Sequence, residues 1–386
     1  SVGVGTGVGV NALLSKSLGE KNFDAANKAA VNGIFLAFCS WAAFALLGGF
    51  FSRTFMALQT DVPEIIAYGD TYLTIIAVAS VGMMFQICFE RLLQSTGKTI
   101  YTMLSQGLGA VINLILDPLL IFGLGPFPAM GIAGAALATV IGQCVGALLG
   151  LFCNLRRNPE ITISFRGFRP HGVTIRKIYA VGVPSIIMSS IGSVMTFGMN
   201  KILGAFNSTA VAVFSAYFKL ESFIFMPVFG LNNGIVPIIA YNYGARKPDR
   251  IRAAAKLGFL YGAAIMAVGV LLFWLIPGRL LGIFNASDYM LEIGIPALRL
   301  ISLSFLPAAF GIVTSSVCHG VLSLIVSVLR QLVLILPVSW LLGHFVGLSA
   351  VWAAFPFAEV FSFLLSAVFM GYMFKTVVRP LEQPEP

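Results

Sequence analysis

An aspartate stands in the middle of a long apolar stretch of this sequence. Asp117 follows Asn-Leu-Ile-Leu and precedes Pro118, within the apolar run Tyr101–Leu124. A carboxylate in such a run is costly to bury and usually faces a cavity or a partner, and Asn113, four residues earlier, shares its helical face. Pro118 also frees a backbone carbonyl one turn back. These groups predict a site for a proton or a small cation such as Na⁺, unless Asp117 serves only to brace a kinked helix.

Charged residues recur in the apolar stretches of the second half of the chain. Lys219 and Glu221 stand two residues apart, so their side chains point to different helical faces and do not pair with each other. Arg299, Arg330 and Glu359 occupy comparable apolar surroundings. Two interpretations stay open for these residues: they form ion pairs between helices, or they line a path through the protein.

The sequence contains no motif typical of an enzyme or of a site for a tightly bound cofactor. It contains none of the H-E-x-x-H, G-x-S-x-G or Walker A motifs. Its three histidines are scattered, and its five cysteines show no metal-ligand spacing. The run Gly3–Gly9 lacks the G-x-G-x-x-G spacing, and its i,i+4 glycine pairs are typical of close helix packing. We therefore expect no enzymatic activity and no cofactor, so any transport must be driven by an ion gradient.

Composition indicates a membrane protein. Of the 386 residues, 58% are hydrophobic and only 10% are charged, whereas soluble domains carry about 25% charged residues. Apolar runs such as Ile34–Phe51, Ala67–Phe89 and Leu257–Ile276 reach the roughly 18–20 residues that cross about 30 Å of hydrocarbon. Because backbone polar groups in lipid must be satisfied within their own segment, these runs predict helices. The fold class is therefore an all-α polytopic membrane protein.

Basic residues favour one side of the predicted membrane. A net charge of +9 would suit nucleic acid binding, but Lys and Arg cluster in alternate loops, notably Lys16–Lys28, Arg156–Lys177 and Arg246–Lys256. This distribution follows the positive-inside rule. We place these loops in the cytoplasm, and we expect a multi-pass protein in contact with the lipid bilayer and without a nucleic acid partner.

The sequence repeats itself at an interval of 225 residues. Gly5 matches Gly230 and Asp24 matches Asp249, and the interval falls to 221 near Cys318–His319. Either about four residues are missing at that point or the halves differ by a deletion. The second half reads as six helices, and the first half shows no counterpart of the first of them. We expect about one and a half further helices before residue 1.

The repeat predicts twelve transmembrane helices in two pseudo-symmetric six-helix lobes, about eleven of them within this sequence. An even number of helices in each lobe gives both lobes the same orientation. The predicted boundaries are an N-terminal lobe at 1–154, a cytoplasmic linker at 155–177, a C-terminal lobe at 178–375 and a tail at 376–386.

Several motifs resemble the multidrug and toxic compound extrusion (MATE) family, in its DinF-like bacterial branch. Asn113–Gly123 resembles the fifth-helix motif of that branch, and Gly131–Thr139 resembles the start of its sixth helix. Lys219–Pro227 and Pro237–Arg246 are similar to the eighth helix and the loop after it, and Leu18–Lys21 is similar to the matching loop of the first half. The resemblance covers essentially the whole chain.

The resemblance implies a secondary active multidrug efflux antiporter, which exports amphipathic or cationic organic compounds in exchange for H⁺ or Na⁺ by alternating access. It places Asp117, Asn113 and Thr139 in an ion-coupling site of the N-terminal lobe. The first helix, which carries a partner aspartate in this branch, is expected before residue 1. A second branch has a glutamate eight residues after a proline, where this chain has Gly192 after Pro184. We expect a monomer in the bacterial cytoplasmic (inner) membrane.

Two other functional classes are alternatives to drug efflux. A flippase or exporter of lipid-linked oligosaccharides or polysaccharides, from the same superfamily, needs several cations in its cavity to hold phosphates, whereas most cations here stand in predicted loops. A lipid-modifying intramembrane enzyme needs a His or Ser constellation in the apolar stretches, and none is visible there. The flippase is therefore the second hypothesis and the enzyme the third.

Overall fold

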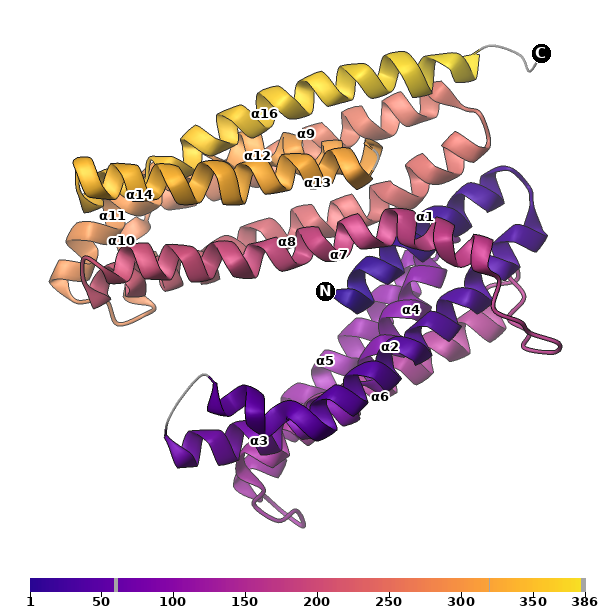
Figure 1. Ribbon diagram of the computed structural model, residues 1–386, viewed down its shortest axis with the longest axis horizontal. Coiled ribbons are helices and arrows are strands. Elements are labelled where there is room, and N and C mark those ends of the chain that lie inside the picture. Colours follow the sequence, from indigo (N-terminus) through magenta and orange to yellow (C-terminus); the bar gives the residue numbers. More distant parts are fainter. Residues whose placement is uncertain (59–61, 319, 383–386) are drawn as a thin grey trace. The chain divides into compact units, whose positions relative to one another are not determined.

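The computed structural model describes residues 1–58, 62–318 and 320–382, and every regular element within these ranges is helical (Figure 1). The first half contains α1 (Val2–Gly19), α2 (Phe23–Ala57), α3 (Pro63–Val78), α4 (Val81–Ser95), α5 (Thr99–Phe122) and α6 (Gly131–Arg157). The second half contains α7 (Gly172–Gly204), α8 (Ser208–Gly244), α9 (Pro248–Leu275), α10 (Pro277–Gly282), α11 (Asp288–Ser302), α12 (Phe305–Val317), α13 (Gly320–Val328), η1 (Leu329–Ile335), α14 (Leu336–Phe345), α15 (Leu348–Val351), α16 (Ala354–Met373), η2 (Phe374–Val378) and η3 (Arg379–Glu382).

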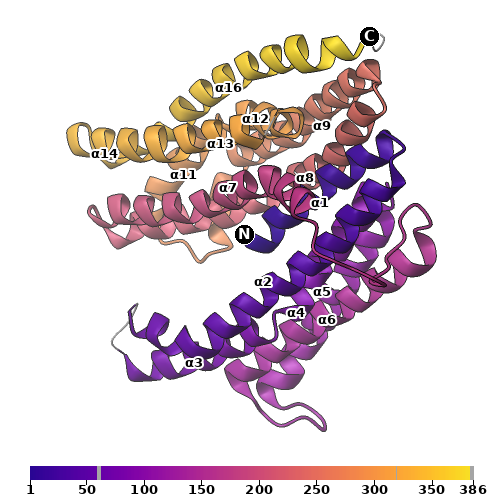
Figure 2. The same cartoon turned by 45° about the vertical axis from the view of Figure 1, so that its right-hand side comes forward.

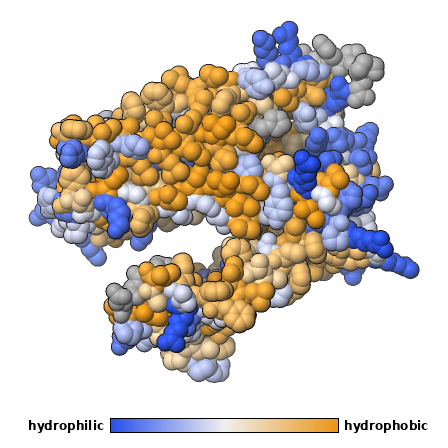
Figure 3. Space-filling view, in the orientation of Figure 1, coloured by the Kyte–Doolittle hydropathy of each residue, from blue (hydrophilic) through white to orange (hydrophobic). Residues whose placement is uncertain are grey.

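The helices present an apolar surface that suits lipid. Within the described residues, eight helices are long and apolar enough to cross a membrane, or ten if each of two bent pairs forms one span. Large apolar side chains such as Phe50, Phe223 and Leu275 are at least 75% exposed. Figure 3 shows hydrophobic residues along the flanks of the helices and hydrophilic residues toward their ends. Water would not tolerate so much contiguous apolar surface, so the predicted polytopic membrane fold is confirmed.

Two of the spans are bent at a serine. α3 and α4 meet at 43°, and α11 and α12 meet at 46°. At these breaks the hydroxyls of Ser80 and Ser304 donate to the carbonyls of Ala77 and Ile301, at 2.7 and 2.6 Å. Such local bonding competes with the helical ladder and favours a bend. The two breaks lie at nearly corresponding positions of the sequence repeat, so both halves share this feature.

The helical stretch from Gly320 to Phe345 changes its pitch halfway along. Its middle segment, η1, is π-helical, between α13 and α14. Pro337 stands in the first turn of α14 and has no N–H, so the carbonyl of Val333 loses its α-helical donor. A wider turn is a common response to such a loss, and π-helical turns occur often at functional sites. The segment presents Arg330 and Gln331 to the cavity described below.

The described chain divides into two compact units, residues 2–183 and residues 184 onward, and α7 contributes to both. In the N-terminal unit, α5 packs along α6, α4 packs against α1 and α6, and α2 packs against α1 and α3 (Figures 1 and 2). In the C-terminal unit, α12 packs against α8, α9 and α16, and α16 runs beside η1 (Figures 1 and 2).

Aromatic side chains build the core of the C-terminal unit. One buried cluster contains Phe214 and Tyr217 of α8, Phe273 of α9, Phe305 of α12 and Phe355 of α16, and all five are at most 7% exposed. Phe273 and Phe305 have ring centroids 5.2 Å apart, and Tyr217 meets Phe355 edge-on at 5.9 Å. Interlocked rings of this kind pack well and resist displacement. The core therefore fixes α8, α12 and α16 relative to one another, beside the cavity.

Candidate functional site

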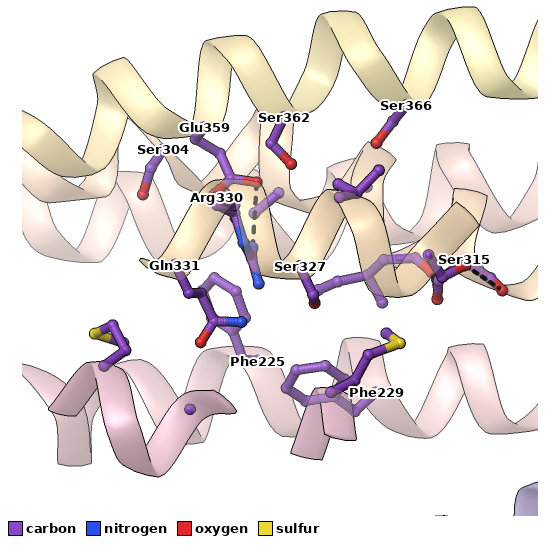
Figure 4. A pocket seen from close by; sticks show the side chains of 18 of the residues that line it. Phe225, Phe229, Ser304, Ser315, Ser327, Arg330, Gln331, Glu359, Ser362 and Ser366 are labelled. Atoms are coloured by element: carbon purple, nitrogen blue, oxygen red, sulfur yellow. Dashed lines mark hydrogen bonds and ion pairs between the residues drawn. The ribbon is translucent and has the colours of Figure 1, made fainter. Parts of the chain in front are cut away.

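The C-terminal unit contains a cavity of about 530 Å³. Its walls come from α7, α8, α12, α13, η1 and α16 (Figure 4). Small-molecule sites occupy roughly 300–1,000 Å³, so the cavity has room for a drug-sized organic molecule. All of its lining residues belong to this one unit.

One wall of the cavity is aromatic. Phe225 and Phe229 of α8 lie across the cavity from the polar side chains of η1 and α16 (Figure 4). Their ring centroids are 6.2 Å apart. Met188 of α7 and Met226 of α8 add flexible thioethers to the lining. Aromatic rings and methionines accommodate flat apolar or cationic molecules of varied shape.

An ion pair lies on the opposite wall. Arg330 of η1 donates from Nη1 to both carboxylate oxygens of Glu359 on α16, at 3.2 and 3.4 Å (Figure 4). Glu359 is only 5% exposed, so its negative charge needs the compensation that Arg330 supplies. The Nε atom of Arg330 has no hydrogen-bond partner among the described residues. The guanidinium thus neutralises Glu359 and retains an unused donor.

A second carboxylate, that of Glu221 on α8, lines the same cavity. Tyr217 stands one turn earlier on α8, and Arg330 and Glu359 line the same cavity. Arg330 forms its ion pair with Glu359, however, and no ion pair of Glu221 is found among the described residues. The described lining of the cavity therefore holds two carboxylates and one guanidinium.

Four of the serine hydroxyls that line the cavity donate to nearby backbone carbonyls. Ser222 donates to the carbonyl of Phe218 at 2.8 Å, and Ser189 donates to that of Ser185 at 3.0 Å. Ser304 and Ser315 likewise donate to carbonyls three residues earlier, each at 2.6 Å. These four residues line the cavity. These four hydroxyls make the cavity wall polar. Because their hydrogens are already bonded to carbonyls, a ligand does not have to supply an acceptor for them.

The N-terminal unit brings together Asp117, Asn113 and Thr139, the three residues proposed for ion coupling. Asn113 Nδ2 donates to Asp117 Oδ1 at 3.4 Å and to Thr139 Oγ1 at 3.3 Å, and Thr139 donates to the carbonyl of Ala135 at 3.0 Å. All three side chains are half-buried. Carboxylate, amide and hydroxyl oxygens are ligands for a hard cation such as Na⁺, and the carboxylate can take a proton instead. The geometry is compatible with either ion.

Close helix packing positions this polar cluster. A Cβ on Gly109 of α5 would stand 2.8 Å from the carbonyl oxygen of Gly142 on α6. A Cβ on Gly142 would stand 2.5 Å from the carbonyl oxygen of Gly109 and 3.3 Å from Cβ of Asn113. Glycine at both positions lets the two backbones approach. This approach sets the distance over which Asn113 reaches Thr139.

The four charged residues predicted for a cleft or for contacts between helices fall into two groups. Glu221 and Glu359 line the cavity, whereas Lys219 and Arg299 do not. The Lys219 Nζ atom lies 5.8 Å from the centre of the Phe284 ring. The Arg299 guanidinium lies 6.0 Å from the centre of the Trp274 ring and donates to the Trp274 carbonyl at 3.3 Å. Lys219 and Arg299 thus make cation–π contacts outside the cavity.

Glu90 of α4 forms a buried polar cluster that was not predicted from the sequence. It is 4% exposed, and its carboxylate oxygens accept hydrogen bonds from Gln86 Nε2 at 2.9 Å and Gln106 Nε2 at 2.7 Å. The i,i+4 spacing of Gln86 and Glu90 is a local signal that predicts the first bond. Gln106 comes from α5, and its approach depends on tertiary packing. The cluster ties α4 to α5.

Comparisons of the sequence with known proteins identify related transporters. The MatE family profile matches residues 1–119 and 184–322. An FAD transporter of Shewanella oneidensis is 25% identical over 99% of this chain and 84% of its own length. The multidrug export protein MepA of Staphylococcus saprophyticus is 26% identical over 96% of this chain and 81% of its own length.

Solved structures share the fold. A crystal structure of MATE in the bent conformation matches with a TM-score of 0.89 at 22% identity, over 97% of this chain and 85% of that chain. A transporter of the MOP superfamily from Pyrococcus furiosus, described as having a binding pocket of reverse polarity, matches with a TM-score of 0.90 at 21% identity, over 99% of this chain and 85% of that chain. At these identities the likeness shows the fold.

Proposed function

The chain belongs to the MatE family, as its motifs suggested, and on that premise we propose that it is a secondary active efflux antiporter for drug-like organic compounds in the bacterial cytoplasmic membrane. Its relatives are named as transporters, in agreement with the expectation that it is not an enzyme. It would act as a monomer, by alternating access, and export amphipathic or cationic compounds in exchange for H⁺ or Na⁺.

The observation that carries this proposal is the cavity of the C-terminal unit. It is large enough for a drug, one wall is aromatic, and its described lining holds one more carboxylate than guanidinium. An aromatic surface with excess negative charge suits an amphipathic cation, because the rings and the carboxylate both attract it. The relationship to MepA, named as a multidrug export protein, supports the same substrate class.

The coupling ion would bind in the N-terminal unit, at Asp117. Its partner Asn113 is neutral, as is Thr139, which Asn113 also contacts, so no cation competes for the carboxylate within this described cluster. An intramembrane carboxylate with neutral partners can exchange an ion, because loading and unloading break no internal ion pair. Binding of H⁺ or Na⁺ at Asp117 would favour one conformation and so drive release of the drug on the other side.

Transport in reconstituted vesicles tests this function. Purified protein in proteoliposomes is given ethidium, a fluorescent aromatic cation, while a proton gradient and a sodium gradient are imposed in separate experiments. We expect one gradient, or both, to drive ethidium movement against its concentration difference. Movement that depends on neither gradient would overturn antiport, and no movement under any condition would overturn drug efflux.

A second candidate is export of FAD, which the S. oneidensis relative favours. FAD carries two phosphates, and sites for phosphates concentrate arginine and lysine. The cavity offers Arg330, but Glu359 already pairs with it and Glu221 adds negative charge. The same charge balance disfavours lipid-linked oligosaccharides, which also carry phosphates. Competition by FAD against ethidium transport in the same vesicles would move this candidate to first place.

A further inference from the structure

The chain that joins α6 to α7 runs along α2 (Figure 2). The backbone N–H of Thr162 donates to Asn27 Oδ1 at 2.7 Å. Further on, the ring centroid of Phe168 lies 5.6 Å from that of Phe35. Between these two contacts the linker advances about 12 Å along the axis of α2. Ile161, which is 5% exposed, fixes the linker to the core of the N-terminal unit. The linker is thus a packed part of this unit.

The linker reaches the level at which the hydrocarbon is expected to begin. Phe35 stands at the start of the apolar run Ile34–Phe51. The sequence repeat matches Phe35 with Leu260 of α9, and Asn32 with Leu257. The two leucines are 62% and 48% exposed, as lipid-facing residues are, whereas Asn32 is 2% exposed and Phe35 is half-buried. On α2 the linker contacts both residues. It therefore covers a face that is open to lipid on α9.

The deepest part of the linker, residues 164–169, combines aromatic and basic side chains and is called the linker tip below. The backbone N–H of Phe168 donates to the carbonyl of Phe165 at 3.0 Å, which closes a tight turn. Phe168 contacts α2, whereas Phe165 is 50% exposed. Arg166 and Arg169 are exposed as well, and no ion pair of either is found among the described residues. The tip thus presents one aromatic ring between two guanidinium groups.

We propose that the linker tip binds anionic phospholipids at the cytoplasmic surface of the membrane. The ring of Phe165 enters the boundary between headgroups and acyl chains, where aromatic side chains are favoured. Arg166 and Arg169 pair with the lipid phosphates, which arginine can hold through two hydrogen bonds. This site is separate from the cavity and from the cluster at Asp117. It does not rest on the proposed efflux function.

The charge of the linker suits an anionic surface. Residues 155–177 contain six arginine and lysine residues and one acidic residue, Glu160. Glu160 is already paired with Lys98 at 3.8 Å. A basic residue close to an anionic membrane strengthens the attraction on the order of fivefold. An acidic protein could also pair with the arginines, but it would have to cover Phe165 at the level where lipid is expected. The position of the tip therefore favours a lipid as its partner.

Fluorescence quenching at the tip tests this proposal. The full-length chain with Phe165→Trp is reconstituted in phosphatidylcholine vesicles that contain a minor fraction of brominated phosphatidylglycerol, which is anionic, or the same fraction of brominated phosphatidylcholine. Bromine quenches tryptophan at short range, so the two kinds of vesicle report which lipid lies at the tip. The unmodified chain supplies the background of its four native tryptophans.

We expect brominated phosphatidylglycerol to quench the added tryptophan at least about twice as strongly as brominated phosphatidylcholine, because the tip concentrates anionic lipid around it. Arg166→Gln with Arg169→Gln should remove most of this difference. Lys247→Gln with Arg250→Gln is the matched control, since it removes the same charge from exposed positions of another basic segment, and it should keep the difference. High salt should reduce the difference by screening. Melting curves establish that each variant is folded.

Three results would overturn the proposal. The first is equal quenching by the two brominated lipids, and the second is a preference that survives the loss of Arg166 and Arg169 or falls equally in the control pair. The third is quenching by aqueous iodide and by neither lipid, which would place the tip in water and favour an acidic protein as its partner. The first and third comparisons need only Phe165→Trp, so they remain decisive if the arginine variant does not fold. Ethidium transport is measured separately and is not at stake in any of them.

Discussion

At the scale of single residues, the protein keeps charge in apolar surroundings in two different ways. Glu359 is held by Arg330, so its charge is permanently neutralised and serves structure. Asp117 accepts a hydrogen bond from the neutral amide of Asn113, and no ion pair of Glu221 is found among the described residues, so each can accept a positive species that comes from outside the protein. We propose that the ion binds at Asp117 and the substrate in the cavity that Glu221 lines. The distinction rests on the partners of each carboxylate rather than on its depth.

Replacement of Asp117 tests the ion site. Asp117→Asn retains the shape and the contact with Asn113 but loses the charge, so we expect ion-driven ethidium export to fall at least about tenfold while the protein stays folded. Export from energised cells and melting temperature in detergent measure the two effects. Asp249→Asn is the control, since the Asp249 side chain is 94% exposed and its pair with Arg252 is a surface pair. Full export by Asp117→Asn would remove Asp117 from the mechanism.

Replacement of Arg330 tests the structural role of its ion pair. Arg330→Gln leaves Glu359 buried without compensation, and we expect a loss of stability of about 2–3 kcal/mol, at the low end for such pairs because the Arg330 side chain is 26% exposed. The double variant Arg330→Gln with Glu359→Gln should recover most of this loss. Thermal unfolding in detergent provides the comparison. A double variant no more stable than Arg330→Gln would show that the pair does not stabilise the unit.

At the scale of helices, two features place the polar residues. Glycines at the crossing of α5 and α6 bring Asn113 within reach of Thr139. The π-helical segment η1 carries Arg330 and Gln331 in the lining of the cavity. At the crossing of α5 and α6 the missing side chains of glycine determine where the polar group lies. In η1 the missing N–H of a proline does so.

Two glycines of α5 allow the effect of close helix packing to be measured separately from the effect of helix propensity. Gly109→Ala puts a Cβ 2.8 Å from the Gly142 carbonyl oxygen, whereas Gly107→Ala meets nothing within 4 Å. We expect Gly109→Ala to lower both the melting temperature and ion-driven export, because α5 and α6 must separate and carry Asn113 away from Thr139. Gly107→Ala should equal or slightly exceed the unmodified protein in stability. Equal behaviour of the two variants would show that the close contact does not matter.

The sequence predicted contacts within a helix better than contacts between helices. Asn113 and Asp117 are four residues apart, so helical periodicity alone placed them together. Arg330 and Glu359 lie on η1 and α16, and their pairing depends on how two spans pack, which no local pattern encodes. The same limit applies to Gln106 and Glu90. The bends at Ser80 and Ser304 were also missed, because a serine in a helix bends it only in some surroundings.

At the scale of the whole molecule, each compact unit holds one polar centre of its own. The cluster around Asp117 lies entirely within residues 2–183, and the cavity lies entirely within residues 184 onward. The sequence repeat predicted equivalent architecture in the two halves, and Val338 at the position that matches Asp117 indicated that the chemistry of Asp117 belongs to one half only. Fold and function are thus distributed differently: the fold is duplicated, and the two proposed binding tasks are divided.

The predicted orientation in the membrane can be measured with single cysteines. Ser164→Cys lies in the basic segment between α6 and α7, and Phe127→Cys lies in the segment between α5 and α6. The positive-inside rule puts residue 164 in the cytoplasm and residue 127 outside. A membrane-impermeant maleimide should therefore label Phe127→Cys in intact cells and label Ser164→Cys only after permeabilisation, with the unmodified chain as background. The reverse pattern would invert the assigned topology.

The serine hydroxyls of the cavity bear on how broad its substrate range can be. A binding site rejects wrong molecules chiefly when they leave its own polar groups stranded. Ser222, Ser304 and Ser315 already donate to nearby backbone carbonyls, so a ligand that makes no contact with these three hydroxyls leaves none of them without an acceptor. This tolerance of different ligands comes from hydrogen bonds already present in the cavity wall and does not require the wall to change shape. These three hydroxyls therefore place no demand of their own on the molecules that the cavity accepts.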